Sequence, residues 1–201
     1  DQKGFTALMI AAFDEHASVV TLLLADDRVD PNTADEDGDT ALTLAAYKGY
    51  ASVVTLLLAD ERVDPNIADQ KGFTALMIAA FDEHASVVTL LLADDRVDPN
   101  IADQYGVMAL RFAAVQGHAA VVTLLLADER VDPNIASQGG FTALIFAAQQ
   151  GTASVVTLLL ADERVDPNIA NRDGDTALIV AAYKGHASVV SLLLADEGVD
   201  T

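Results

Sequence analysis

Two short apolar blocks alternate along the chain, and a polar segment follows each pair of them. In the first pair, Leu8, Ala11 and Ala12 have the spacing of one face of a helix. The second block, VVTLLL at residues 19–24, carries a threonine on its polar side. The polar segment ends with Asp-Pro-Asn at residues 30–32, which is typical of a turn because proline fixes its own φ and disfavours helix in the residue before it. The pattern predicts two short antiparallel helices and a projecting turn.

The limits of these helices follow from residues with known preferences for helix ends. Thr6 is a good N-cap for the first helix, and Gly4 before it can adopt a positive φ in a tight turn. The first helix should stop near residues 15–16, because four other units have a glycine there, which suits the left-handed end of a helix. Those glycines are Gly49, Gly117, Gly151 and Gly185.

The pair of blocks recurs six times with a period of 34 residues, and residues 1–32 recur letter for letter at 69–100. Self-similarity at such a period predicts a solenoid, in which each unit buries its apolar face only by stacking on the next. We therefore expect an all-α array over residues 1–201, with one continuous core and no internal domain boundary. Its units are residues 1–34, 35–68, 69–102, 103–136, 137–170 and 171–201.

The shared pattern GxTALxxAAxxGHxxVVxLLL resembles the ankyrin repeat, and the likeness covers all six units. The resemblance implies an ankyrin-like solenoid of stacked helix-turn-helix units with projecting β-turn or hairpin loops. It also implies a non-catalytic module that binds another protein. Two departures concern local geometry: the segment ADDRVDPN at 25–32 is one residue longer than the usual loop and lacks its glycine, and the family's proline before leucine is alanine. These alanines are Ala7, Ala41, Ala75, Ala109, Ala143 and Ala177.

Charge and composition narrow the possible partners. With 31 acidic and 11 basic residues, the net charge of −20 opposes binding to nucleic acid or to an anionic membrane and favours basic partners or cations. Cysteine is absent, which removes disulfides and thiolate chemistry. No apolar run approaches the ~18 residues that span a bilayer, and no signal peptide is visible. We expect a soluble protein, with an intracellular location favoured.

The loops after the second helices share a charge pattern. An aspartate such as Asp26 is followed by another acidic residue and then, in the first five units, by an arginine such as Arg28. Because equivalent positions in neighbouring units are about a Debye length apart, the arginines should offset the carboxylates locally while the excess negative charge still repels. We expect these loops to form a solvated rim.

Residues that could carry catalysis or hold a metal have simpler structural explanations. Four histidines, His16, His84, His118 and His186, occupy one repeat position and should form a row between helices rather than a catalytic cluster. Residues 35–39 resemble the start of a calcium-binding loop, but the twelfth position is Ala46 where a bidentate glutamate is required. The sequence therefore predicts neither an enzyme nor a cofactor or metal site.

The outer units carry no polar capping helix of the kind that arrays normally need for solubility. The last unit keeps Leu192, Leu193 and Leu194. We expect an excised segment of a longer array or an engineered one, with end-to-end self-association through the terminal repeats.

The resemblance also predicts which residues bind a partner. In ankyrin-like arrays, early positions of each unit and those near the end of the first helix look into a concave groove, and here these positions vary most. Lys3 occupies one of these early positions. Arg111 is added because it is charged, whereas the equivalent residues of the other repeats are mostly apolar. The candidate residues are Phe5, Phe13, Asp39, Tyr47, Lys48, Phe73, Phe81, Asp82, Tyr105, Val107, Arg111, Val115, Phe141, Gln149, Asp175, Tyr183 and Lys184.

Aromatic side chains with acidic neighbours suit a partner polypeptide that is basic and partly apolar, since rings supply buried area and carboxylates steer approach. The same rings could instead pack against neighbouring turns. Two alternative functions also remain: a structural spacer or scaffold, for which near-identical repeats suffice, and an acidic array that binds cations.

Overall fold

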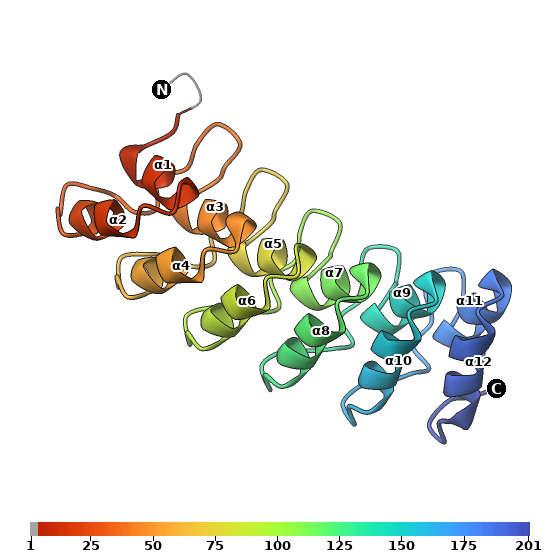
Figure 1. Cartoon of the computed structure of the whole chain (residues 1–201). Coiled ribbons are helices and arrows are strands. Elements are labelled where there is room, and N and C mark those ends of the chain that lie inside the picture. The colour runs from red at the N-terminus through yellow and green to blue at the C-terminus, as the bar shows by residue number, and fades with distance from the viewer. Residues whose placement is uncertain (1–3) are drawn as a thin grey trace. The chain divides into compact units, whose positions relative to one another are not determined.

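A computed structural model describes residues 4–201, and these form twelve α-helices in six helix pairs (Figure 1). The chain divides into two compact units, Asp1–Gln104 and Tyr105–Thr201. From here on, 'unit' means one of these two parts, and the 34-residue sequence units are called repeats. Lys3 lies outside the described residues. The first unit contains α1 (Ala7–Phe13), α2 (Ala17–Leu24), α3 (Ala41–Lys48), α4 (Ala51–Leu58), α5 (Ala75–Phe81) and α6 (Ala85–Leu92). The second contains α7 (Ala109–Gln116), α8 (Ala119–Leu126), α9 (Ala143–Gln150), α10 (Ala153–Leu160), α11 (Ala177–Lys184) and α12 (Ala187–Ala195).

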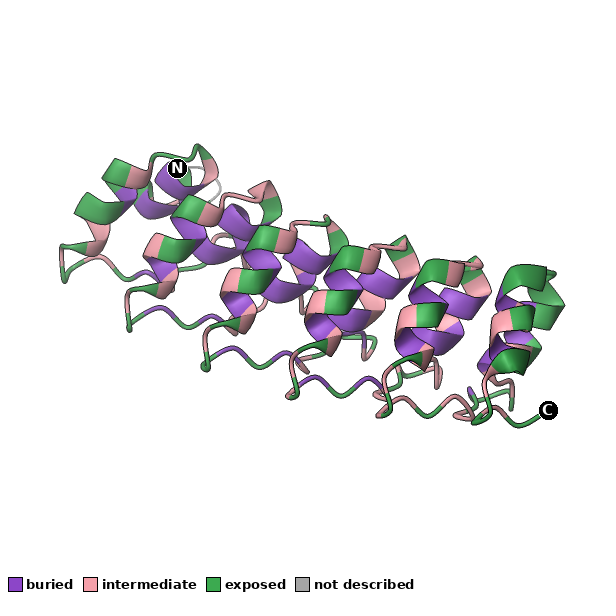
Figure 2. Ribbon diagram, turned by 60° about the horizontal axis from the view of Figure 1, so that its bottom comes forward, coloured by how far each residue is buried: buried purple, intermediate pink, exposed green. Residues whose placement is uncertain are grey.

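Each unit is a stack of helix pairs in two layers. In the first unit, α3 packs between α1 and α5, and α4 packs between α2 and α6. In the second unit, α9 lies between α7 and α11, and α10 lies between α8 and α12. The buried residues lie on the sides of the helices that face one another (Figure 2). The all-α repeat architecture is therefore confirmed, whereas the single continuous array over residues 1–201 stays a prediction.

Small residues on the first helices and branched residues on the second explain this packing. Ala45 and Ala46 of α3 have no exposed surface, and the same is true of Val53 and Leu57 of α4. Alanine lets neighbouring helices approach closely, and the larger side chains fill the space between the layers. None of the helices in the described part of the chain is long and apolar enough to cross a membrane.

The predicted helix ends are also confirmed. The Thr6 and Thr40 hydroxyls accept hydrogen bonds from the backbone N–H of Met9 and Thr43, as N-caps do. Gly49 ends α3 with a φ of +71°. Glu15 and Glu83 occupy the same position in two other repeats and have φ values of +58° and +61°. These two glutamates therefore adopt a conformation that favours glycine.

The acidic turn at residues 35–39 uses its carboxylates to hold the turn itself. Asp35 Oδ1 accepts hydrogen bonds from the backbone N–H of Asp37 and of Asp39, each at 2.9 Å. Asn171 Oδ1 makes the equivalent bonds in the last repeat. Within residues 4–201, no three His, Cys, Asp or Glu side chains are grouped so that they could hold a metal ion. Asp35 and Asn171 thus have a local structural role in their turns.

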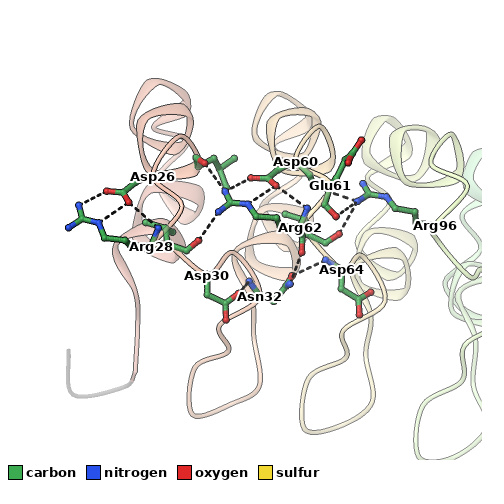
Figure 3. Close-up of polar contacts among 12 residues, drawn as sticks. Asp26, Arg28, Asp30, Asn32, Asp60, Glu61, Arg62, Asp64 and Arg96 are labelled. Carbon is green, nitrogen blue, oxygen red and sulfur yellow. Dashed lines mark hydrogen bonds and ion pairs between the residues drawn. The ribbon is translucent and has the colours of Figure 1, made fainter.

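The arginines after the second helices do more than form a solvated rim. Arg62 pairs with Asp60 at 2.6 Å, and its guanidinium also donates to Leu24 O at 2.6 Å and Val29 O at 3.3 Å in the preceding repeat (Figure 3). Arg96 reaches Leu58 O in the same way. We call Arg62, Arg96 and Arg164 the arginine ladder, because each one binds the end of the second helix of the repeat before it.

Asparagines in these turns add a second bond between the repeats of each unit. Asn32 donates from Nδ2 to Arg62 O at 2.7 Å, and its Oδ1 accepts from the backbone N–H of Asp64 at 2.8 Å (Figure 3). Asn66 and Asn134 make equivalent bonds to the repeats that follow them. The longer loop is therefore a connection between neighbouring repeats.

Candidate functional site

The predicted binding residues occupy two positions in each helix pair. One group lies at or next to the carboxyl end of a first helix, and we call it the helix-end row: Phe13, Tyr47, Lys48, Phe81, Asp82, Val115, Gln149, Tyr183 and Lys184. The other lies in the turn before a first helix, and we call it the turn row: Phe5, Asp39, Phe73, Tyr105, Val107, Phe141 and Asp175. Arg111 belongs to neither row, because it lies in the first turn of α7.

The helix-end row of the first unit combines exposed rings with a cation. Tyr47 is 54% exposed and Phe81 is 45% exposed, although each lies in the last turn of a helix whose other side is buried. Lys48 Nζ lies 4.1 Å from the centroid of the Phe13 ring and 5.9 Å from that of Tyr47. A cation at such distances is attracted to the ring faces, so Lys48 connects the rings of two adjacent repeats.

The turn row of the first unit is less open. Phe5, Asp39 and Phe73 are all half-buried. Asp39 Oδ1 accepts a hydrogen bond from the Thr43 hydroxyl at 3.0 Å. Burial raises the pKa of Asp39 above its usual range, the Thr43 hydrogen bond opposes that shift, and nearby carboxylates, Asp35 and Asp69 among them, add to it. Asp39 therefore lies among other carboxylates in a turn that is partly shielded from solvent.

The second unit also combines exposed aromatic rings with a lysine. Tyr105 is 61% exposed and Tyr183 is 86% exposed. Lys184 Nζ lies 5.7 Å from the centroid of the Tyr183 ring. Val115 is half-buried, and so is Gln149, whose backbone oxygen contacts His186. Tyrosine and lysine thus end α11 as they end α3.

Three candidates in the second unit are held by neighbours or buried. The guanidinium carbon of Arg111 lies 4.1 Å from the centroid of the Phe146 ring, and that ring lies 5.1 Å from the ring of Phe141. Phe146 of α9 was not a candidate, because its position looks apolar in every repeat and nothing in the sequence places it beside Arg111. Val107 is only 4% exposed, so we remove it from the turn row from here on.

The histidine row has the expected structural role in both units. His84 Nε2 lies 3.0 Å from Tyr47 O, and His186 Nε2 lies 3.0 Å from Gln149 O. Because a carbonyl oxygen only accepts, Nε2 carries the proton in both rings. His84 and His186 therefore each join the start of a second helix to the end of the first helix in the preceding repeat.

Comparisons with known proteins agree with the repeat architecture of the chain. The family model described as ankyrin repeats (3 copies) matches residues 1–69, 57–137 and 110–201. The crystal structure of EF0377, an ankyrin repeat protein, is 27% identical, with a TM-score of 0.87, and the match covers 94% of this chain and 96% of that one. An ankyrin repeat domain from Acinetobacter baumannii AYE is also 27% identical, with a TM-score of 0.85 and the same coverage.

A third similar structure is the ankyrin repeat domain of Bcl-3, a member of the IkappaB protein family. It is 27% identical, with a TM-score of 0.88, and the match covers 96% of this chain and 84% of that domain. The search of curated protein sequences found no significant match.

Proposed function

The chain belongs to the ankyrin repeat family, and from that premise we propose that it is a non-catalytic module that binds a partner polypeptide through its helix-end and turn rows. The observation that carries the proposal is the exposure of Tyr47, Phe81, Tyr105 and Tyr183, which are 45–86% exposed. Large aromatic side chains bury much area when they meet a partner, and they dominate the energetics of many interfaces.

The partner's chemistry follows from the charges around these rings. The chain carries a net charge of −20, and Asp39 and Asp82 lie in or beside the two rows. A basic segment is attracted to such a surface over several ångströms, and this attraction raises its association rate. We therefore propose a partner that presents basic residues interleaved with apolar ones.

Lys48 and Lys184 refine this proposal. Each lies against the ring of the tyrosine that precedes it, and Lys48 also lies against Phe13. A basic side chain of the partner can take the place of either lysine on the ring face, because the ring attracts any ammonium or guanidinium. A carboxylate of the partner can pair with the displaced lysine.

The proposal can be tested with a displayed library of random peptides. We expect the wild-type chain to enrich peptides that contain both basic and apolar residues. Binding of an enriched peptide should weaken by about 1–3 kcal/mol, roughly 5- to 150-fold in Kd, in Tyr47→Ala or Tyr183→Ala. Tyr105→Ala and Phe73→Ala test the turn row with the same expectation.

Matched controls lie on the exposed side of the second helices. Thr55 of α4 and Thr123 of α8 are exposed and lie on second helices, which carry none of the residues of the two rows, so Thr55→Glu and Thr123→Glu should leave peptide binding unchanged. Circular dichroism checks that every variant is folded. Equal loss of affinity in the tyrosine variants and in these controls, with all variants folded, would show that the two rows are not the binding surface.

A further inference from the structure

The sign of the charge alternates along the carboxyl ends of the first helices in the first unit. Two acidic residues follow α1, a lysine ends α3, and two acidic residues follow α5. We call these five residues the charge row: Asp14, Glu15, Lys48, Asp82 and Glu83. Glu15 and Glu83 are exposed, and Lys48 is half-buried.

The charged groups of the row lie on adjacent repeats. Within the first unit, α3 packs between α1 and α5 (Figure 1). Lys48 Nζ reaches the Phe13 ring of the preceding repeat at 4.1 Å, and Ser52 Oγ donates a hydrogen bond to Glu15 Oε1 at 3.4 Å. The charges therefore follow one another from repeat to repeat in the order negative, positive, negative.

The charges of the turns lie too far away to cancel this order. The acidic turn at residues 35–39 precedes α3, whereas Lys48 is the last residue of that helix. The helix has 8 residues, so its ends are about 12 Å apart at ~1.5 Å per residue. This separation exceeds the Debye length of about 8 Å at physiological salt, so the charge of the turn is largely screened at the charge row. Lys71 lies in the equivalent turn before α5 and is screened in the same way.

The second unit does not repeat this order. Gln116, Gln150 and Lys184 occupy the positions of Asp14, Lys48 and Asp82, and a glycine follows each of them. Two neutral residues and one lysine cannot distinguish the order of charges on a partner as the first unit can. Selection by charge order therefore belongs to the first unit.

The spacing of the repeats sets the spacing of matching charges on a partner. Packed helices lie about 8–10 Å apart. An extended polypeptide advances about 3.3 Å per residue, so about three of its residues cover one repeat. A segment that crosses the ends of α1, α3 and α5 therefore meets the three charged groups at every third residue. Between them it meets the exposed rings of Tyr47 and Phe81, which directly precede Lys48 and Asp82.

We propose that the charge row selects an extended partner segment with a basic, an acidic and a basic residue at every third position and apolar residues between them. This inference rests on the proposed function, because it specifies the partner of the helix-end row. The acidic residue of the partner pairs with Lys48. Its two basic residues pair with the acidic residues that follow α1 and α5. The order reads the same from either end, so the segment can lie in both directions.

Net charge and charge order favour different partners. The net charge of −20 attracts most strongly the segment with the most positive charge. The charge row disfavours a basic residue at the middle position, because Lys48 repels it. An exposed pair contributes little by itself, but moving the acidic residue from the middle to one end replaces two attractive pairs with two repulsive ones.

Short labelled peptides that differ only in their charged positions provide the test. The matching peptide is Lys-Leu-Ser-Glu-Leu-Ser-Lys. Its isomer, Lys-Leu-Ser-Lys-Leu-Ser-Glu, has the same composition and net charge, and the polybasic peptide is Lys-Leu-Ser-Lys-Leu-Ser-Lys. In fluorescence anisotropy at about 0.15 M salt, we expect wild type to bind the matching peptide about tenfold more tightly than the isomer. It should also bind the matching peptide more tightly than the polybasic one.

Lys48→Asp should reverse the preference, because all three helix ends are then acidic. Aspartate already occupies this position in two repeats of the unit, so the fold should be kept. The variant should bind the polybasic peptide about tenfold more tightly than the matching one. The double variant Thr55→Asp/Thr89→Asp is the control. It changes the net charge by the same amount at exposed positions of α4 and α6, and it should keep the preference of wild type.

A second variant changes the end of α5 into that of α3. Asp82→Lys combined with Glu83→Gly gives the Lys-Gly pair that ends α3. Glycine suits the φ of +61° at position 83, so stability should not fall. With charges in the order negative, positive, positive, this variant should bind the matching peptide and its isomer equally. It also keeps the proposal testable if circular dichroism shows that Lys48→Asp does not fold.

Three results would overturn the proposal. Wild type could bind the polybasic peptide most tightly, Lys48→Asp could keep the preference of wild type, or none of the three peptides could bind. The proposed function is judged separately by Tyr47→Ala, which should weaken every peptide that binds, including those selected from the library. Loss of binding in Tyr47→Ala without a preference for charge order would leave the proposed function standing and remove only the charge row.

Discussion

At the scale of single residues, one arginine position connects neighbouring repeats. Arg164 pairs with Asp162 at 2.6 Å, and it also donates to Leu126 O at 2.6 Å and to Val131 O at 3.1 Å. The hydrogen bond from Arg164 lowers the pKa of Asp162 below its usual range. A guanidinium offers five N–H donors in a fixed plane, so one side chain can serve the carboxylate and the two carbonyl groups together.

Substitution of Arg164 by lysine should therefore weaken the fold although the charge is kept. We expect Arg164→Lys to lower the free energy of unfolding by about 1–2 kcal/mol, because an ammonium group cannot bind Asp162 and the carbonyls of the preceding repeat at once. Urea unfolding followed by circular dichroism measures the change.

The control for this variant is Arg28→Lys. The Arg28 side chain is 89% exposed, whereas that of Arg164 is 35% exposed, and Arg28 lies in the first described repeat. At concentrations where the chain is monomeric, Arg28→Lys should leave unfolding unchanged. Similar losses in both variants would show that the local pair with aspartate, rather than the bonds between repeats, stabilises the loop.

At the scale of the helix, the carboxyl end of each first helix depends on a left-handed residue. Gly49 and Gly185 have φ values of +71° and +75°. They differ in their surroundings, since the His84 ring lies over Gly49 and nothing lies over Gly185. Alanine at either position adopts an unfavourable φ, at a cost of about 1 kcal/mol, but only at Gly49 does its methyl group meet a neighbouring repeat.

We therefore expect Gly49→Ala to destabilise the protein by about 1–3 kcal/mol more than Gly185→Ala does, since overpacking adds to the backbone cost. Thermal unfolding of both variants at the same low protein concentration measures the difference. If the two variants lose the same stability, the contact of His84 with this helix end contributes little to the stacking of repeats.

Helix ends and repeat units could be predicted from the sequence because they depend on short-range rules. A threonine N-cap, a glycine at the helix end and an Asp-Pro pair act on the residues next to them. The arginine ladder could not be predicted in the same way, because its acceptors are backbone carbonyls 33 to 38 residues earlier, such as Leu24 O for Arg62. Every residue has such a carbonyl, so the sequence contains no signal for the pairing.

The candidate surface was predictable only in part for a related reason. Position within the repeat predicted Tyr47, Phe81, Tyr105 and Tyr183 as binding residues, and all four rings are exposed, although binding itself stays a prediction. The same rule placed Val107 on the surface, but it is buried. Exposure of one side chain depends on what the neighbouring repeat puts beside it, and equivalent positions in this chain differ in their neighbours.

At the scale of the whole molecule, the main electrostatic feature is the excess of negative over positive charge. The arginine ladder neutralises some aspartates, yet the net charge is −20 over 201 residues. A large net charge disfavours compact states through self-repulsion, and salt screens that repulsion. The short ion pairs of the ladder are also weakened by salt, but partly exposed pairs contribute little each.

Repulsion should therefore dominate the response to salt. We expect the midpoint of thermal unfolding to rise as sodium chloride is increased from about 0.02 M to about 0.5 M, a range over which the Debye length falls from well above to well below the spacing of neighbouring repeats. A midpoint that falls steadily over this range would show that the attractive pairs of the ladder dominate instead.

The arginine ladder also has a direction, and this matters while the protein is being made. Arg62, Arg96 and Arg164 all bind carbonyl groups of the repeat on their amino-terminal side. A ribosome releases the amino-terminal repeats first, and arrays of this kind fold through contacts between nearest neighbours. Each repeat that leaves the ribosome therefore finds, already folded, the helix end to which its own arginine binds. Within each unit, folding can keep pace with synthesis one repeat at a time, without waiting for residues that have not yet been translated.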